Sequence, residues 1–439
     1  MPAQSATFAV LSCTAATADD LHVDAADCSR LLQLLDLVPD PRKRRGVRHS
    51  VTSILAIAAA AVLAGSRSVL AIGEWAAEAP QVVLAALGAR YHPTSGRFTA
   101  AHVDTFRRVL RSVDAEAVDT AIGVFLAERA GLGASDSASG GADGPPQHRP
   151  DNDRPDNDRP DNGGQPAPPS RPDQDKLTTR GLSVDGKTVR GAMQPDGRAV
   201  HLLAAMAPEV PAVLAQRNVT PKTNEITQVK PLLEPLNLTG WAVTLDALHA
   251  QRETARYLVK DKGAAYVFTA IKDNQPTLFA ELDALPWTTV PIGHTMHDRG
   301  HGRQEKRTIQ VTPAPDGIFP YAQQAFLIER YVYDLGGALT SAVAALGITA
   351  LSAEQAGPER LAGLVRDHWG IEALHHIRDV TYDEDRSQLR TGSAPQVLAG
   401  IHNLAIGALR IAGRTNIASS LRWISRNPTR ALSILGQPA

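Results

Sequence analysis

The stretches Leu182-Ser183-Val184-Asp185 and Trp241-Ala242-Val243-Thr244-Leu245-Asp246 decide the fold. Each is a short apolar run that ends in an aspartate, which predicts a buried strand followed by a turn. Similar runs at Ala199 to Ala207, Ala212 to Asn218 and Ala265 to Ile271 predict three more strands, and helical patterns occur at Glu225 to Leu236 and Gln251 to Lys262. Three strands followed by helix, strand, helix and strand predict a mixed α/β sheet.

The region before these strands has a helical pattern. Apolar residues recur at helical spacing in Leu31 to Leu37 and in Val103 to Leu126, and an apolar run extends from Val51 to Gly65. That run is too short to cross a bilayer, so it predicts a buried helix. We therefore expect a small all-helical domain over residues 30–132, after a flexible N-terminal segment, residues 1–29.

Residues 133–179 differ in composition from everything around them. They are rich in Gly, Pro, Ser and Asp, and they contain tandem Arg-Pro-Asp-Asn copies that begin at Arg149, Arg154 and Arg159. A chain with so little apolar surface to bury predicts a disordered linker. A peptide-recognition tract is the alternative, but the copies offer no aromatic or PxxP anchor.

Charge is balanced over the whole chain but not along it. With 45 Lys+Arg against 46 Asp+Glu the net charge is -1, which excludes a protein that is basic throughout. From Arg386 to Ala439, however, there are seven arginines and no acid. This pattern predicts a basic helical C-terminal segment, residues 391–439, with a polyanion partner; solvated surface is the alternative. Spacing of four residues predicts a shared helix face for the pairs Arg410/Arg414 and Arg422/Arg426.

Cysteine content and the N-terminus favour a reducing compartment. The chain has two cysteines, Cys13 and Cys28, too few for a disulfide framework or a cysteine zinc site. The first basic residue is Arg30, so the charged start of a signal peptide is not recognisable, and Val10 to Cys13 lacks the apolar stretch of a lipoprotein signal. We expect a cytoplasmic protein without a membrane partner.

Three acidic residues are candidates for the chemistry. Asp185 and Asp246 each follow an apolar run, and carboxylates at the ends of adjacent strands point into the crevice where α/β sheets bind ligands. Either aspartate alone is an ordinary turn residue. Glu372 lies between Ile371 and Leu374 in a helical stretch, which predicts a carboxylate drawn toward the packed face, where it needs a partner or a cation. Three hard oxygen ligands favour Mg²⁺ or Mn²⁺, and two such ions about 4 Å apart support phosphodiester displacement.

Other metal sites fit the sequence less well. Asp246-x-x-His249 and Glu372-x-x-His375 have the spacing of a di-iron site, but that site needs four inward-facing helices and Asp246 ends a strand. His294, His297 and His301 could bind zinc, although the surrounding glycines predict an irregular loop. The loop His301-Gly302-Arg303 is more typical of a phosphate contact or of plain surface, and Thr223-Asn224-Glu225 of a helix cap.

Seven groups of residues occur in a fixed order over roughly residues 30–435. They are Pro39-Asp40-Pro41-Arg42 with Gly46-Val47-Arg48-His49; Val184-Asp185-Gly186-Lys187-Thr188-Val189-Arg190-Gly191-Ala192; Lys222-Thr223-Asn224-Glu225-Ile226; Thr244-Leu245-Asp246-Ala247-Leu248-His249; Asn274-Gln275-Pro276; His301-Gly302-Arg303-Gln304-Glu305; and His368-Trp369-Gly370-Ile371-Glu372 followed by Arg378-Asp379-Val380 and Glu384-Asp385. With them the chain resembles the DDE transposases of bacterial insertion sequences, specifically the ISAs-type family that includes the H-repeat-associated proteins.

The resemblance implies an RNase H-like catalytic domain, residues 180–390, with an insertion at about residues 285–345. It implies that Asp185, Asp246 and Glu372 are the catalytic triad and bind Mg²⁺ or Mn²⁺, with Asp185 bridging two ions. The implied activity is cleavage at the ends of the element, by in-line attack of water, and joining of the 3′-hydroxyls to target DNA, without a covalent enzyme intermediate. The implied partners are the terminal inverted repeats and target DNA, bound by a homodimer.

Basic residues near the triad and in the C-terminal segment are the expected DNA contacts. They are Lys187, Lys272, Arg303, Arg366, Arg410, Arg414, Arg422 and Arg426. Two alternative functions remain open at this point: a catalytically inactive, transposase-derived DNA-binding protein, and an RNase H-like nuclease without strand transfer. Metal-dependent cleavage separates the first alternative from a transposase, and joining of a pre-cut end separates the second.

Overall fold

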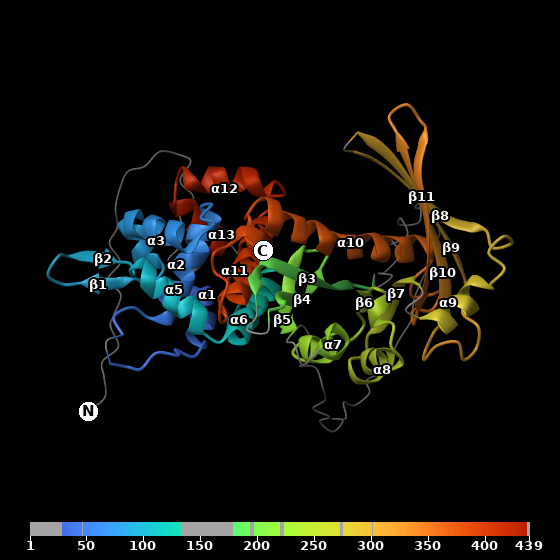
Figure 1. The fold of residues 1–439 in the computed structure, drawn as a ribbon, viewed down its shortest axis with the longest axis horizontal. Coiled ribbons are helices and arrows are strands. Elements are labelled where there is room, and N and C mark those ends of the chain that lie inside the picture. The colour runs from blue at the N-terminus through green and yellow to red at the C-terminus, as the bar shows by residue number, and fades with distance from the viewer. Residues whose placement is uncertain are drawn as a thin grey trace, which may run out of the picture. The chain divides into compact units, whose positions relative to one another are not determined.

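The computed structural model describes residues 29–45, 47–132, 179–193, 197–219, 224–272, 275–300 and 302–436. Contacts divide the chain into two units: residues 1–126, 189–199 and 377–439 form the first, and residues 127–188 and 200–376 form the second. Figure 1 shows the elements of both. The predicted N-terminal segment and linker lie almost entirely outside the described residues.

Helices dominate the first unit, and the C-terminal ones pack against the N-terminal ones. They are α1 (Ser29–Asp36), α2 (Val51–Leu63), α3 (Val69–Glu78), α4 (Gln81–Ala86), α5 (Val103–Ser112), most of α6 (Ala115–Arg129), α11 (Ala394–Ile411), α12 (Ile417–Ser425) and α13 (Thr429–Gly436). Ser50 caps α2 by accepting a hydrogen bond from the N–H of Ser53, and nearly every residue of α2 is buried. The prediction that this apolar run forms a buried helix is confirmed. α2 lies at the centre of the unit, since it contacts α1, α3, α5, α11, α12 and α13.

One hairpin interrupts this helical region. β1 (Arg90–His92) and β2 (Arg97–Thr99) pair antiparallel, with Tyr91 opposite Phe98. The side chain of Gln81 accepts a hydrogen bond from the N–H of Phe98 at 2.7 Å and donates one to its carbonyl at 3.2 Å, which ties the hairpin to α4. The sequence predicts only a turn here. The prediction of an all-helical domain over residues 30–132 is therefore wrong at this hairpin, which interrupts the helices.

A buried ion pair joins the end of α10 (Pro358–Val380) to α11 within the first unit. Arg378 donates to both carboxylate oxygens of Glu384, at 2.8 to 3.1 Å, and His402 Nδ1 lies 2.9 Å from Glu384 Oε1. Burial opposes the charge of Glu384, but attraction to Arg378 and the hydrogen bond with His402 hold the pKa of Glu384 well below its usual range. The Tyr382 ring stacks on His402 with centroids 4.5 Å apart, which shields the pair from water.

A nine-stranded mixed sheet, nearly all of it in the second unit, follows in the chain. Its strand order is β5-β4-β3-β6-β7-β11-β10-β9-β8. In chain order, the first five strands of this sheet are β3 (Gly181–Met193), β4 (Ala199–Ala207), β5 (Ala212–Val219), β6 (Ala242–Leu245) and β7 (Ala265–Ile271). β3, β6 and β7 run parallel to one another, with α7 (Glu225–Leu233) between β5 and β6, and α8 (Arg252–Arg256) with the π-helical turn η2 (Tyr257–Asp261) between β6 and β7. The predicted α/β fold with a mixed sheet and a helical N-terminal region is confirmed.

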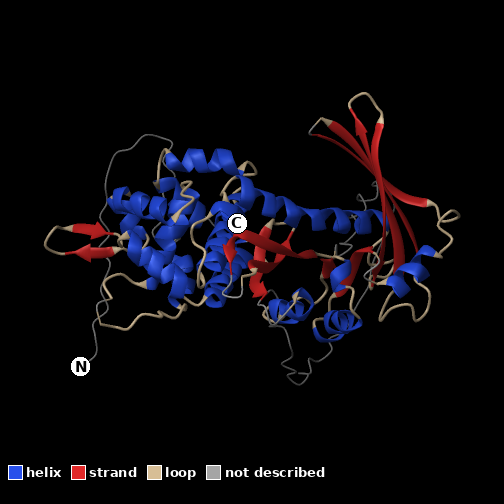
Figure 2. Cartoon of the chain, in the orientation of Figure 1, coloured by secondary structure: helices blue, strands red, loops and turns tan. Residues whose placement is uncertain are grey.

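Four long strands extend this sheet beyond β7, in the region where the sequence predicts an insertion (Figure 2). After α9 (Pro276–Asp283) come β8 (Ile292–Gly300), β9 (Arg303–Pro313), β10 (Gln324–Asp334) and β11 (Leu339–Thr349), all antiparallel to their neighbours, and β11 pairs with β7. Apolar side chains of these strands pack under α10: Ile309, Phe326 and Ile328 meet Leu361, Leu364 and Val365. We call β8–β11 the sheet extension.

The structure rules out the histidine zinc site considered from the sequence. His294 and His297 belong to strand β8, not to an irregular loop, and because they are three residues apart they point to opposite faces of the sheet. His301 lies outside the described residues. No helix in the described ranges is both long enough and apolar enough to cross a membrane.

Replacing Glu384 with Gln should strongly destabilise the first unit. The substitution removes the negative charge that Arg378 and His402 share in a fully buried setting, and breaking a buried ion pair typically costs about 3–5 kcal/mol of unfolding free energy. Equilibrium urea unfolding measures this loss. The same substitution at the exposed Glu74 is the control and should change stability by less than about 0.5 kcal/mol; equal effects of the two substitutions would contradict a structural role for the pair.

Candidate active site

The register of two parallel strands places Asp185 beside Asp246. Ser183 of β3 is paired with Thr244 of β6, and each aspartate lies two residues further along its own strand direction. Side chains two residues apart share a face of a sheet, and neighbouring strands lie about 4.8 Å apart. Asp246 follows the last residue of β6, as predicted, whereas Asp185 lies in the middle of β3, because the strand continues through Gly186 to Met193 instead of turning.

Helix α10 covers this face of the sheet and is held there by a hydroxyl cluster. The Thr244 hydroxyl lies 3.2 Å from both Ser183 Oγ and His368 Nδ1, and the Ser183 hydroxyl donates to the carbonyl of Asp367 at 3.4 Å. Burial lowers the pKa of His368 to about 4, so its imidazole is a neutral hydrogen-bonding group. Since Glu372 follows His368 by four residues, it lies on the same side of the helix, above the aspartates.

Glu372 is exposed, contrary to the prediction that it turns toward the packed face. Its neighbours Ile371 and Leu374 are fully buried, and Glu372 lies at the edge of that buried stripe. Its charge nevertheless acts on both sides of the site: it adds to the effect of burial in raising the pKa of Asp185, and to the hydrogen bond with Glu305 in raising that of Arg330 in β10. Glu372 is therefore a carboxylate open to a ligand and not one enclosed by the core.

Asp185 is the electrostatically strained member of the group. Burial, together with the negative charges of Asp246, Glu372 and Glu225, raises the pKa of Asp185 to about 6, against a hydrogen bond from the N–H of Gly186 that lowers it. Its side chain is 26% exposed and lies 3.5 Å from His375 Nδ1. Closely spaced carboxylates with a raised pKa are typical of functional sites, and a cation would relieve their repulsion.

Three histidines and Glu225 surround the aspartates, and the sequence prediction missed their role. His375 contacts Asp185, and His249 Nε2 lies 3.9 Å from Asp246 Oδ1 and 3.4 Å from Glu225 Oε2. His201 Nε2 lies 2.6 Å from Glu225 Oε1. The carboxylate-x-x-His spacing was the available signal. It does not mark a di-iron bundle, since Asp246 follows a strand: His249 lies beside Asp246 of its own motif, whereas His375 lies beside Asp185 and not beside Glu372 of its own motif.

Glu225 links helix α7 to the strand that carries Asp185. Asn224 caps α7, as predicted, and Glu225 follows it. Hydrogen bonds from His201 and His249 lower the pKa of Glu225 to about 2, so it is a permanent anion. A Cβ atom at Gly186 would lie 2.6 Å from His201 Nε2 and 2.9 Å from the Glu225 carboxyl carbon, so only glycine permits this close approach.

The three predicted ligands suit a divalent cation in their chemistry but are not assembled around one. Asp185, Asp246 and Glu372 offer only hard oxygen donors, and burial together with the negative charges of Asp246 and Glu372 raises the pKa of Asp185, so a cation would be favoured at this position. As the side chains are placed, no group of three His, Cys, Asp or Glu residues within the described ranges could hold a metal ion. Cation binding would therefore require these carboxylates to move closer together.

The predicted DNA contacts in the second unit differ in exposure. Lys187 is only 6% exposed, because β3 continues past Asp185 and Lys187 is a buried residue of that strand. This burial argues against a phosphate contact. Lys272 is exposed at the end of β7. Arg303 and Arg366 are 48% and 51% exposed, and each forms an ion pair, with Glu305 and Asp298 respectively.

The C-terminal arginines fall into two classes. Arg422, in α12, and Arg426, its C-cap residue, are exposed about one turn apart. Arg410 and Arg414 do not share a helix face, because α11 ends at Ile411 and the left-handed Gly413 follows. Burial lowers the pKa of Arg410, and the Arg414 guanidinium lies 3.5 Å from the ring centroid of Trp423.

The chain matches two protein families. The family described as Transposase DDE domain matches residues 176–407, and the family described as DDE_Tnp_1-associated matches residues 32–126. The first match covers more than half of the chain and includes all three carboxylates.

Three proteins of Escherichia coli are similar to the chain. "Putative protein YbfL" is 29% identical over 52% of this chain and 63% of its own length. "Putative transposase YncI" is 31% identical, over 52% and 61%, and "H repeat-associated putative transposase YhhI" is 28% identical, over 52% and 63%. The chain thus spans less than two thirds of these relatives. A cryo-EM structure of a piggyBac transposase synaptic complex with hairpin DNA aligns with a TM-score of 0.40 and 11% identity, over 93% of this chain and 81% of that one.

Replacing Asp185 with Asn should stabilise the second unit at neutral pH. The folded pKa of about 6 exceeds the unfolded value of about 3.9, so the folded state binds the extra proton between these values. Stability therefore falls as the pH rises from about 4 to 6, and the full penalty applies above that. The amide removes this penalty.

Urea unfolding should show a gain of about 2 kcal/mol at about pH 7.5, discounted for partial exposure, and no gain near pH 4. The exposed Asp283→Asn is the control and should be neutral at both pH values. A loss of stability at neutral pH in Asp185→Asn would contradict the repulsion between the carboxylates.

Proposed function

Since the chain belongs to the family described as Transposase DDE domain, we propose that it is a metal-dependent DNA transposase that acts through Asp185, Asp246 and Glu372. Its substrates are the two ends of an insertion sequence, which it cuts, and a target DNA, to which it joins the 3′-hydroxyls.

The shared register of Asp185 and Asp246 is the observation that carries the proposal. It places two carboxylates side by side on the sheet face under α10, and the charge of Glu372 reaches Asp185 from that helix. A purely structural role would leave this concentration of negative charge unexplained, because like charges gathered around the partly buried Asp185 cost stability.

The chain's contribution to the reaction is to hold and orient these oxygen donors. When bound, Mg²⁺ or Mn²⁺ supplies positive charge at the scissile phosphate and lowers the pKa of the attacking hydroxyl. Asp185, Asp246 and Glu372 would hold the metal through their carboxylate oxygens. Neutral His368 keeps α10, and with it Glu372, above the aspartates across the range from about pH 5 to 8.

Replacing Asp185, Asp246 or Glu372 with Ala should each abolish cleavage and leave DNA binding nearly intact. The three carboxylates offer donors to a cation but repel phosphate, so their loss should cost several kcal/mol of transition-state stabilisation, a rate loss of at least about a hundredfold. The assay is Mg²⁺-dependent cleavage of a plasmid that carries the DNA flanking the gene, with binding followed separately.

The matched control for the triad is Glu281→Ala, an exposed acid on α9. It should retain full activity. Turnover within about tenfold of the unmodified protein in any triad variant would exclude the assignment. Cleavage without joining of a pre-cut end would identify a nuclease, and metal-independent DNA binding without cleavage would identify an inactive DNA-binding protein.

Replacing both Arg422 and Arg426 with Gln should weaken DNA binding across sequences. Each lost phosphate contact should reduce the slope of log K against log salt by about 0.9. The double variant Arg107→Gln/Arg108→Gln is the control, because both arginines are exposed on α5 and Arg107 already pairs with Asp104. Equal slopes for the Arg422/Arg426 variant and the unmodified protein would show that these arginines only face water.

A further inference from the structure

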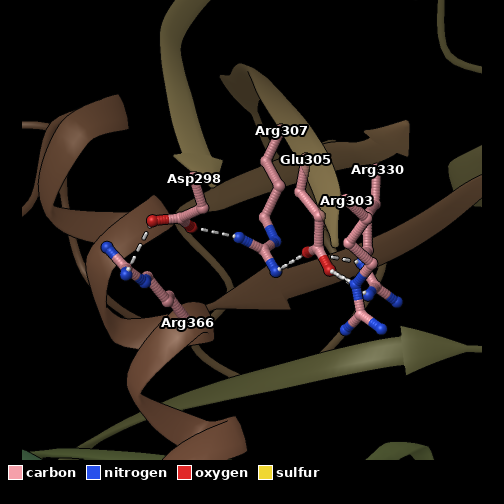
Figure 3. Close-up of polar contacts among 6 residues, drawn as sticks. All are labelled: Asp298, Arg303, Glu305, Arg307, Arg330 and Arg366. Carbon is pink, nitrogen blue, oxygen red and sulfur yellow. Dashed lines mark hydrogen bonds and ion pairs between the residues drawn. The ribbon is translucent and has the colours of Figure 1, made fainter. Parts of the chain in front are cut away.

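A network of four arginines and two acids lies on the sheet extension and α10 (Figure 3). Arg330 binds both oxygens of Glu305, at 2.8 and 3.1 Å, and Arg303 Nε donates to Glu305 Oε1 at 2.8 Å. Arg307 bridges Glu305 and Asp298, and Arg366 Nη2 donates to Asp298 at 3.0 Å. The network carries two positive charges in excess.

Strand register explains why these side chains meet. Asp298 is paired with Glu305, and Arg307 with Arg330, so the residues of β8, β9 and β10 in the network all point to one face. Side chains alternate along a strand, so Arg299 and Lys306 point to the opposite face. The network face is the one that α10 covers, since Arg366 from that helix joins it.

Arg307 connects the network face of the sheet extension to α10, the helix that carries Glu372. Its guanidinium lies 4.9 Å from the ring centroid of Trp369, it is 11% exposed, and it bonds to both acids of the network. Cation–π contact and paired hydrogen bonds hold such a group in one position. Arg330 is paired with Arg307 across the two strands, and Glu372 lies three residues after Trp369 on α10, so the same contacts hold Arg330 where the charge of Glu372 acts on it.

The other arginines keep one side toward solvent. Arg303, Arg330 and Arg366 are 48%, 36% and 51% exposed, in contrast to Arg307. Among the described residues Arg303 donates only through Nε, and Arg366 only through Nη2, so both keep further N–H donors. Guanidinium groups with such donors are the preferred ligands of phosphate.

We propose that the exposed sides of Arg303, Arg330 and Arg366 form a phosphate-binding site beside Glu372, which holds the DNA strand that the carboxylates cut. Glu305 is the fixed counter-ion that sets the spacing of Arg303 and Arg330. The inference rests on the proposed function, extends the expectation for Arg303 and Arg366 to one defined site, and adds Arg330 and Glu305 to it.

The low pKa of Glu305 agrees with this role. Hydrogen bonds from Arg330 and Arg303 and the charge of Arg307 lower the pKa of Glu305 to about 2, so it remains an anion when DNA is present. An internal anion lets several guanidinium groups stand close together before a phosphate arrives. The same groups without Glu305 would repel one another.

The double variant Arg303→Gln/Arg330→Gln tests the site. Binding of a fluorescein-labelled duplex of random sequence is measured by anisotropy at several salt concentrations, without divalent cations so that no cleavage occurs. Two lost contacts should make the slope of log K against log salt shallower by about 1.8 and weaken binding about tenfold or more near 0.1 M salt.

Arg299→Gln/Lys306→Gln is the matched control, because it makes the same charge change on the opposite face of the same strands. Its slope should equal that of the unmodified protein. Arg366→Gln leaves Glu305 and its partners untouched and should make the slope shallower by about 0.9. This variant tests the phosphate-binding site even if the first double variant fails to fold.

Equal slopes for the variants on both faces, or an unchanged slope in Arg366→Gln, would overturn the site. Failure of the inference and of the proposed function are separable. If the unmodified protein does not cleave DNA but the network variants lose phosphate contacts, the proposed catalysis is wrong and the binding site remains. If cleavage occurs and the network variants bind like the control, only this inference is wrong.

Discussion

The hydroxyl of Thr244 connects the three elements on which the site depends. It lies within hydrogen-bonding distance of Ser183 on β3 and of His368 on α10, and Thr244 itself belongs to β6. Two strands and one helix are thereby fixed at the level just before the carboxylates. A shift of β6 by one residue would move Asp246 to the other face of the sheet, away from Asp185 and Glu372.

The local pattern of the sequence predicted much of the sheet. β4 and β7 begin and end where the apolar runs do, and α7 begins at Glu225, directly after its Asn224 cap. These features depend on neighbouring residues and can therefore be recognised without the fold. β3 was predicted too short because Gly186-Lys187 has the composition of a turn; in the structure the missing Cβ of Gly186 makes room for His201 and Glu225 while the strand continues.

Features that depend on distant segments were not predictable in the same way. That the inserted strands would extend the same sheet through β11 and β7 requires knowledge of a pairing between segments far apart. Glu372 was assigned to the packed face from Ile371 and Leu374, but successive helix positions differ by about 100°, and only the packing of α10 decides where the buried stripe ends. The placement of His201 and Glu225 beside Asp185 likewise follows from tertiary approach alone.

The strand order leaves β8 at one margin of the nine-stranded sheet, with backbone groups on its outer side that no strand of that sheet pairs. Such a margin can template the addition of a strand from another molecule, which leads to aggregation. β8 is a poor template: its register is broken at Gly293, and it carries the charged side chains Asp298 and Arg299 near its end. The ionic side chains on the sheet extension thus also favour colloidal stability, because a strand of another molecule that paired with β8 would have to place its side chains next to these charges.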